Sequence, residues 1–113
     1  MHEMALAESV VRLAEERAAA EGARRIRAVI VEIGALSCVE PEALTFCFDA
    51  VSRGTLAEGA ELRIERIEGA AYCSRCERTV AITARYDPCP ECGAYPLQPT
   101  AGTEMRVQAI EIE

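Results

Sequence analysis

Four cysteines occur as two closely spaced pairs in the second half of the sequence. Cys73-Ser-Arg-Cys76 is followed, after twelve residues, by Cys89-Pro-Glu-Cys92. Two cysteines separated by two residues can wrap a tight turn around one side of a tetrahedral ion, and two such turns supply four thiolates. Soft thiolates favour zinc or iron over magnesium or calcium, and a closed shell of four leaves no position for a substrate. The pattern therefore predicts one structural Zn²⁺.

Two other uses of these cysteines stay open on the motif alone. Disulfides are disfavoured, because the N-terminus lacks the basic region of a secretory signal and the six cysteines then point to a reducing compartment. An iron electron-transfer site is the stronger rival, since the CPECG turn resembles a rubredoxin knuckle. Rubredoxins enclose their iron with aromatic side chains, whereas only Tyr72, Tyr86 and Tyr95 lie nearby and Trp is absent. Zinc is the favoured ion.

The N-terminal Met-His-Glu forms a second candidate metal site. His2 is the only histidine of the chain, and its imidazole, its own amide nitrogen and the α-amine of Met1 can chelate one ion together. Three nearly coplanar nitrogens suit the square-planar geometry of Ni(II) or Cu(II), with Glu3 as a possible fourth donor. The alternative is that His2 is a solvated terminal residue and that Glu3 is a favourable charge at a helix N-terminus.

Composition excludes several other functions. The chain has 113 residues and a formal charge of -7, with a pI near 4.8. Nucleic-acid binding is disfavoured because it needs clustered Lys and Arg. No apolar run approaches the roughly 20 residues of a membrane span, so we expect a cytoplasmic protein. Catalysis is also disfavoured, because the sole histidine is terminal and the paired cysteines would be occupied by metal.

Two helices and a central strand are expected before the cysteine region. Residues 4–21 show helical spacing of apolar residues and end near Gly22. Residues 26–34, IRAVIVEIG, are almost continuously apolar and predict a strand covered on both faces. Pro41 suits the first turn of a second helix over residues 40–52. The apolar residues at helical spacing in these segments are Leu6, Ala7, Val10, Val11, Leu13, Ala14, Ala18, Leu44, Cys47, Phe48 and Val51.

Two alternating segments bracket the cysteine region. Residues 60–69 and 104–113 alternate apolar and polar side chains and predict half-buried strands. We expect them to form a hairpin interrupted by the cysteine-rich excursion. The fold class is therefore α+β, an α/β sandwich with a three-stranded sheet and two helices. The predicted domains are 1–68 with 100–113, and a zinc ribbon over 69–99 inserted between the last two strands, where Val80 and Ile82 suggest a short strand.

The order and spacing of these motifs resemble one known family over the whole chain. MHEMALAES, then GALSCVEPEALTFCFD, then CSRC and CPECG before a final strand are similar to the HypA/HybF hydrogenase maturation factors. The resemblance implies a nickel metallochaperone rather than an enzyme, which binds Ni²⁺ as transient cargo and inserts it into the large subunit of [NiFe]-hydrogenase. It implies the GTPase HypB as a partner, a monomer or homodimer, and leaves open whether urease also receives nickel.

The resemblance also assigns individual residues. It implies that His2 is the essential nickel ligand, that the backbone of Met1, His2 and Glu3 completes the site, and that the four paired cysteines hold zinc. Glu40 matches an acidic position implicated near nickel or in partner contact, although a charge at a helix N-terminus explains it as well. For the two remaining thiols, Cys38 and Cys47, ordinary packing is the default expectation.

Overall fold

An amphipathic helix, α1 (His2–Ala20), opens the chain. The computed structural model describes the backbone from His2 to Glu113 and the side chains from Glu3 onward. The buried stripe of α1 consists largely of small residues, which let the helix lie close to the sheet: Ala7, Val10, Val11, Ala14 and Ala18. Leu13 was expected on this stripe but is 36% exposed, at its margin. Gly22, at φ 68°, follows the helix, and the Ala23 N–H donates to the Ala18 carbonyl.

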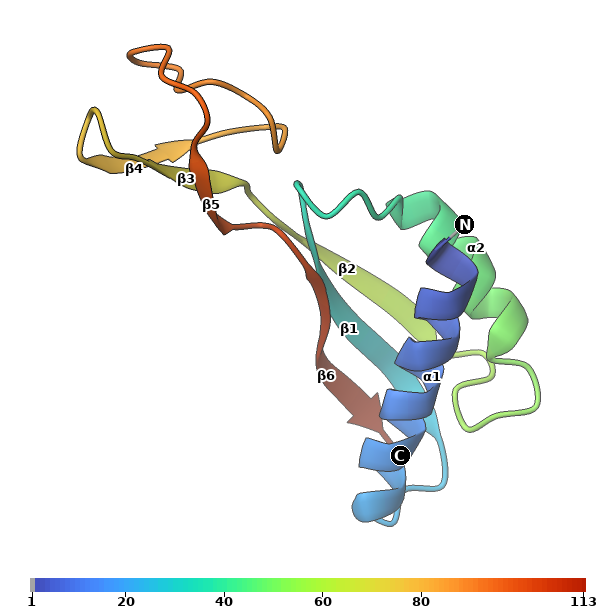
Figure 1. Cartoon of the computed structure of the whole chain (residues 1–113). Coiled ribbons are helices and arrows are strands. Elements are labelled where there is room, and N and C mark those ends of the chain that lie inside the picture. Colours follow the sequence, from blue (N-terminus) through green and yellow to red (C-terminus); the bar gives the residue numbers. More distant parts are fainter. Residues whose placement is uncertain (1) are drawn as a thin grey trace. The chain divides into compact units, whose positions relative to one another are not determined.

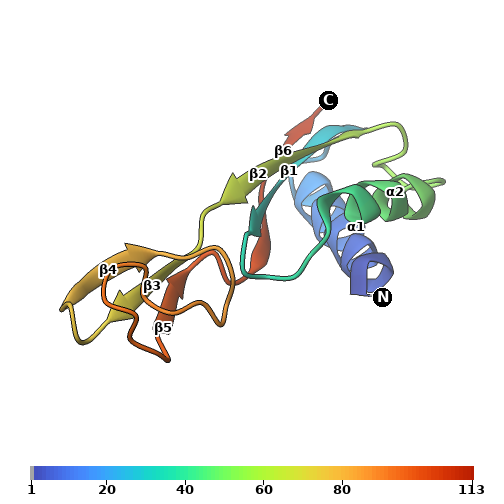
Figure 2. The ribbon, with the colours of Figure 1, turned by 90° about the horizontal axis from the view of Figure 1, so that it is seen from above.

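The apolar run after α1 forms the central strand β1 (Ile26–Gly34), as predicted. It is followed by helix α2 (Pro41–Val51). Pro41 occupies the first turn of α2, where a missing N–H costs nothing. Leu44 and Phe48 are the buried residues of this helix. Both helices cover the same face of the sheet and contact each other (Figure 2).

The first sheet contains β1, β2 (Glu61–Ile67) and β6 (Met105–Ile112) in the order β2-β1-β6 (Figure 1). The Ala35 N–H donates to the Ile67 carbonyl, so β1 and β2 end together and run parallel, whereas Gly34 bonds to Glu104 and β6 runs antiparallel. The expected hairpin is therefore wrong: β2 and β6 share a sheet but flank β1. The reason is the crossover through α2, which places β2 beside β1 in parallel.

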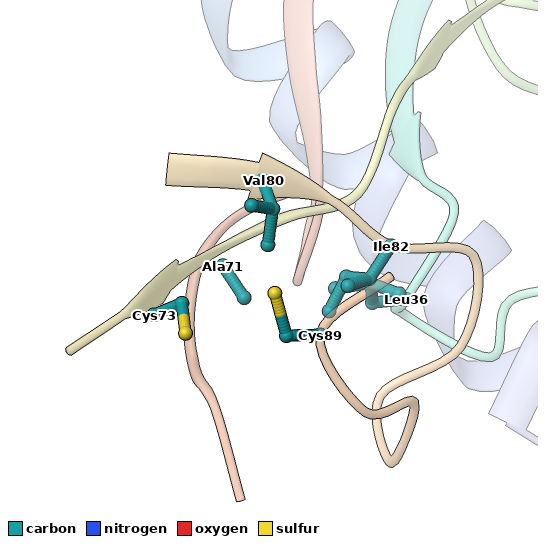
Figure 3. Close-up of a cluster of buried hydrophobic side chains, with 6 residues drawn as sticks. All are labelled: Leu36, Ala71, Cys73, Val80, Ile82 and Cys89. Atoms are coloured by element: carbon teal, nitrogen blue, oxygen red, sulfur yellow. The ribbon is translucent and has the colours of Figure 1, made fainter. Parts of the chain in front are cut away.

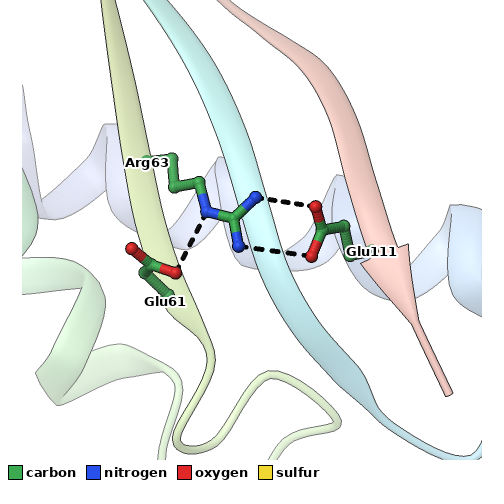
Figure 4. A network of polar contacts seen from close by, with 3 residues as sticks. All are labelled: Glu61, Arg63 and Glu111. Atoms are coloured by element: carbon green, nitrogen blue, oxygen red, sulfur yellow. Dashed lines mark hydrogen bonds and ion pairs between the residues drawn. The ribbon is translucent and has the colours of Figure 1, made fainter.

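Long polar side chains cover the sheet face that the helices leave open. From β2, the Arg63 guanidinium reaches across β1 and donates to both Glu111 oxygens on β6, at 2.6 and 3.3 Å (Figure 4). Its Nε also donates to Glu61. These hydrogen bonds raise the pKa of Arg63, with the Glu111 contact the largest cause. Arg106 makes a similar contact to Glu32. The stems of such side chains shield apolar strand residues from water.

The chain divides into two compact units. The first comprises residues up to Glu32, Val39–Glu65 and Arg106–Glu113; the second comprises Ile33–Cys38 and Arg66–Met105. The second unit contains β3 (Ala70–Cys73), β4 (Arg78–Ala81) and β5 (Gln98–Ala101) in an antiparallel sheet of order β4-β3-β5.

The predicted fold class is confirmed. It consists of two helices on a three-stranded sheet, with a cysteine-rich ribbon between the last two strands of that sheet. The domain boundaries 1–68 with 100–113 and 69–99 stay a prediction. No helix of the described residues is long and apolar enough to cross a membrane.

Candidate metal centre

The four paired cysteines converge on one point in the second unit. The Sγ atoms of Cys73, Cys76, Cys89 and Cys92 all lie within 4.8 Å of one another. Cys73 and Cys92 are 3.6 Å apart, and Cys76 and Cys89 are 3.9 Å apart. A tetrahedral zinc with Zn–S bonds near 2.3 Å would separate its sulfurs by about 3.8 Å. The spacing and the donor set therefore fit a Zn²⁺ ion.

Each cysteine pair forms a turn whose backbone supports its first thiolate. The Cys76 N–H donates to Cys73 Sγ, and the Glu91 N–H donates to Cys89 Sγ, both at 3.4 Å. The residue after each second cysteine has a left-handed backbone, at φ 57° for Glu77 and 79° for Gly93. This conformation turns the chain away from the site after the second ligand. The two halves of the site are therefore built alike.

Thiol pKa values at the site show strong mutual interaction. The side-chain hydrogen bond with Cys92 is the largest cause that raises the pKa of Cys76 to about 12. The backbone N–H of Cys92 is the largest cause that lowers the pKa of Cys89. The protein thus already favours the thiolate at Cys89. A bound metal deprotonates coordinating thiols in any case, so metal binding at this centre releases protons.

Two polar contacts hold the segment between the cysteine pairs. Arg78 of β4 forms an ion pair with Glu91, inside the second turn. Asp87 accepts hydrogen bonds from the N–H and hydroxyl of Thr83 and from the Ala84 N–H. The Thr83 hydroxyl is the largest cause of the lowered pKa of Asp87. Both contacts fix the loop that delivers Cys89 to the site.

A small apolar cluster supports the metal centre, and one member comes from far away in the sequence. Leu36, only 2% exposed, packs with Ala71, Val80, Ile82 and two of the clustered cysteines, Cys73 and Cys89 (Figure 3). Leu36 follows β1, and its N–H donates to the Gly102 carbonyl at 2.7 Å. The segment after β1 is thus part of the unit that holds the cysteines.

Close backbone contacts hold the segment after β1 in place, and they explain why glycine occurs at positions 34, 69 and 102. A Cβ added to Gly34 would collide with the carbonyl of Gly102. A Cβ added to Gly69 would lie 2.6 Å from the Ile82 carbonyl and 2.8 Å from the Leu36 side chain. Sequence reasoning missed the role of Leu36. The glycines at 34, 69 and 102, each at the end of a predicted strand or loop, were the only signal of this close approach.

The second predicted site lies at the start of the first unit. Met1 and the His2 side chain lie outside the described residues. The structure does bring Glu3 and Glu40 together, because the Glu40 N–H donates to Glu3 Oε2 at 3.2 Å. The Glu40 carboxylate accepts from the Glu42 N–H at 3.4 Å and caps α2. Glu40 thus has the structural role of a helix cap, next to the segment that carries the predicted nickel ligands.

The two remaining cysteines do not join the cluster of four. Cys38 is exposed and has a left-handed backbone with φ 64°, while Cys47 is half-buried on α2. The expected packing role therefore fits the half-buried Cys47 but not the exposed Cys38.

Known proteins match this arrangement over the full chain. Residues 1–112 match the family described as HypA, hydrogenase/urease nickel incorporation, metallochaperone. The chain belongs to the HypA family. Among its relatives, the hydrogenase maturation factors HypA of Dechloromonas aromatica and Azotobacter chroococcum are 54% and 55% identical, each over 100% of both chains.

Solved structures of the family share the fold. The solution structure of the Ni metallochaperone HypA from Helicobacter pylori aligns with a TM-score of 0.72 and 28% identity, over 99% of this chain and 97% of that one. The resemblance noted in the sequence is therefore confirmed. Its relatives are described as metallochaperones and maturation factors, which are not enzyme activities.

Proposed function

We propose that this protein is a nickel metallochaperone that binds Ni(II) at its N-terminus and delivers it to the large subunit of [NiFe]-hydrogenase. The observation that carries the proposal is membership of a nickel-incorporation family over residues 1–112, in a chain that keeps Met-His-Glu at its start. The GTPase HypB is the proposed partner in delivery, and the cytoplasm, where thiols stay reduced, is the proposed location.

The proposed nickel site uses the α-amine of Met1, the amide nitrogen of His2 and its imidazole, with Glu3 nearby. Glu3 is held by the Glu40 N–H, which supports a role for Glu40 in fixing the N-terminal segment rather than in binding nickel. Binding requires a deprotonated amide and a neutral imidazole, so nickel affinity should fall as the pH falls. A cargo site that releases its ion under changed conditions needs this property.

The proposed second ion is a resident zinc held by Cys73, Cys76, Cys89 and Cys92. When bound, it would supply structural cross-linking and no reaction, because all four positions are filled by the protein. The sulfur spacing described above supports this assignment. Elemental analysis tests it: one zinc per chain is expected, whereas iron with visible thiolate absorption would favour an electron-transfer protein.

Nickel titration calorimetry of untagged protein with Met1 as its first residue tests the proposal. We expect one high-affinity site at neutral pH, lost in His2→Ala. Addition of one residue before Met1 should weaken binding nearly as much, because the α-amine is displaced from the chelate. Glu8→Ala, a change at an exposed position of α1, is the control and should bind as wild type does. Equal nickel affinity in wild type and His2→Ala would refute the N-terminal site.

A further inference from the structure

The two cysteines of each turn differ in their exposure to solvent. Cys73 and Cys89, the first of each turn, are 0% and 3% exposed and belong to the apolar cluster around Leu36 (Figure 3). Cys76 and Cys92, the second of each turn, are only partly buried and pack against that cluster. A dissolved reagent that reacts with thiolates therefore reaches one cysteine of each turn before the other.

The same two pairs differ in the hydrogen bonds that their sulfurs accept. Cys73 Sγ accepts from the Cys76 N–H, and Cys89 Sγ accepts from the Glu91 N–H, both at 3.4 Å. Among the described residues, no backbone N–H donates to the Sγ of Cys76 or Cys92. An N–H that donates to a thiolate stabilises its negative charge, and a stabilised thiolate is a weaker nucleophile. Hydrogen bonding therefore selects the same two reactive sulfurs as exposure does.

Protonation does not distinguish the four sulfurs when zinc is bound. A thiol that coordinates zinc is deprotonated outright, so all four cysteines are thiolates in the loaded protein. Their relative reactivity then depends on access and on how strongly the surroundings stabilise each negative charge. Both conditions favour Cys76 and Cys92.

Each of the two more exposed sulfurs has a buried sulfur of the other turn beside it. Cys92 Sγ lies 3.6 Å from Cys73 Sγ, and Cys76 Sγ lies 3.9 Å from Cys89 Sγ. A disulfide bond is about 2.05 Å long, so a movement of less than about 2 Å would join the sulfurs of either pair. The buried sulfur of each pair can therefore resolve an oxidised partner, and the bond formed would connect the two turns.

We propose that Cys76 and Cys92 are the sites at which a two-electron oxidant such as hydrogen peroxide attacks the loaded centre, and that the attack releases zinc reversibly. This inference rests on the zinc ion proposed above. It adds to that structural role a site of covalent modification, located at the second cysteine of each turn.

The reaction balances with peroxide as the only oxidant. The Cys92 thiolate attacks the O–O bond, so a sulfur–oxygen bond forms, the O–O bond breaks and hydroxide leaves. The Cys73 thiolate then attacks the sulfenic sulfur and expels a second hydroxide, which leaves a Cys73–Cys92 disulfide. The two sulfurs together lose two electrons, and the peroxide gains them. Cys76 and Cys89 react in the same way with a second peroxide.

Zinc leaves because each disulfide removes two of its ligands. A structural zinc site keeps four protein ligands, and the first disulfide leaves only two. The disulfides connect the same two turns that the ion connected, so the ribbon stays cross-linked without metal. A dithiol reductant restores the four thiolates by thiol–disulfide exchange, and the site can then bind zinc again.

Alkylation of the zinc-loaded full chain maps the reactive sulfurs. The Cys38→Ser/Cys47→Ser variant is used, because the exposed Cys38 would otherwise take up the reagent. After brief treatment with N-ethylmaleimide, mass spectrometry of singly labelled chains should find the label on Cys76 or Cys92 at least about tenfold more often than on the two buried cysteines. An even distribution, or a preference for the buried pair, would overturn the proposal.

Peroxide treatment of the same variant tests the products. Zinc should be released to a colorimetric chelator, disulfide mapping should find Cys73–Cys92 and Cys76–Cys89, and a dithiol should restore zinc binding. Disulfides within a turn, Cys73–Cys76 or Cys89–Cys92, would contradict the resolving role of the buried sulfurs. Zinc that stays bound after peroxide treatment would contradict the proposal as a whole.

A second variant removes the two reactive sulfurs but keeps zinc ligands in their places. Because histidine also binds structural zinc, Cys76→His/Cys92→His should retain the ion and release it to peroxide at least about tenfold more slowly than wild type, after subtraction of the release without peroxide. Cys38→Ser/Cys47→Ser also removes two thiols and should release zinc at the wild-type rate. Unchanged release from the histidine variant would overturn the proposal, and if that variant does not bind zinc, the alkylation map decides.

Elemental analysis of the reduced protein separates this proposal from the zinc assignment on which it rests. Wild type without zinc would refute the assignment and the proposal together. One zinc per chain, with all four cysteines equally reactive, would leave the assignment intact and refute only the proposal.

Discussion

Glu77 and Gly93 occupy equivalent places in the two cysteine turns, although only one of them is glycine. Both have positive φ, at 57° and 79°. A residue with a Cβ pays about 1 to 2 kcal/mol in this conformation, and part of that cost is offset because glycine has more freedom when unfolded. The two turns are therefore alike in geometry but differ in conformational cost.

This difference predicts opposite effects of two substitutions. Glu77→Gly should stabilise the zinc-loaded protein by about 0.5 to 1 kcal/mol, and Gly93→Ala should destabilise it by about 1 kcal/mol. A Cβ at Gly93 would meet no atom within 4 Å, so the loss is conformational rather than steric. Urea unfolding at a fixed zinc concentration measures both, and a Gly93→Ala variant as stable as wild type would contradict this explanation.

Residue spacing was enough to predict that the four cysteines come together but not what supports them. Two Cys-x-x-Cys pairs define a tetrahedral donor set whatever surrounds them, and the four sulfurs indeed lie together. The Cys76 and Glu91 amides that bond to sulfur were not predictable, because backbone direction depends on the local turn. For Glu40, sequence left a ligand and a helix cap as alternatives, and the hydrogen bond to Glu42 supports the cap.

At the scale of elements, segments with strong periodicity were predicted, whereas two of the three short strands were not. β1, α2, β2 and β6 lie where apolar patterning placed them. The hairpin was wrong because alternation in a strand carries no information on which neighbour it pairs with. β3 and β5 were missed, since each has four residues without clear apolar alternation, whereas Val80 and Ile82 had indicated the equally short β4. Pro99 lies within β5, where it is tolerated because β5 is at a sheet edge.

The segment after β1 gives a prediction at this scale. Leu36→Ala should destabilise the cysteine-rich unit by about 2 to 5 kcal/mol, because Leu36 is 2% exposed beside two ligand cysteines. Release of zinc to a colorimetric chelator should therefore be faster than in wild type. Leu13→Ala removes the same atoms from a position that is 36% exposed and serves as the control. Similar release rates for the two variants would exclude Leu36 as a support of the site.

At the scale of the molecule, the two units should differ in their dependence on metal. The apolar cluster of the second unit has six buried members, two of which are the proposed zinc ligands Cys73 and Cys89. A core of this size cannot offset the loss of chain entropy, so we expect a metal ion on the four cysteines to replace the missing apolar burial. The first unit instead buries apolar residues from both helices and β1.

Removal of zinc with a chelator under reducing conditions should therefore unfold only one of the units. In amide NMR spectra, signals from β3, β4 and β5 should lose their dispersion, while those from α1, α2 and β1 up to Glu32 should keep theirs. Re-addition of zinc should restore the lost signals. Loss of dispersion in both units together would show that the first unit has no stability of its own.

The placement of Leu36 also limits how this protein can be recombined with its relatives. A chimaera that exchanged only Arg66–Met105 would import four ligands but leave behind Ile33–Cys38, the other segment of the same unit. The imported ribbon would then meet a foreign side chain at position 36 and a foreign backbone against Gly102. Successful exchange requires both segments to be transferred together, although Val39–Glu65, which belongs to the first unit, separates them in the sequence.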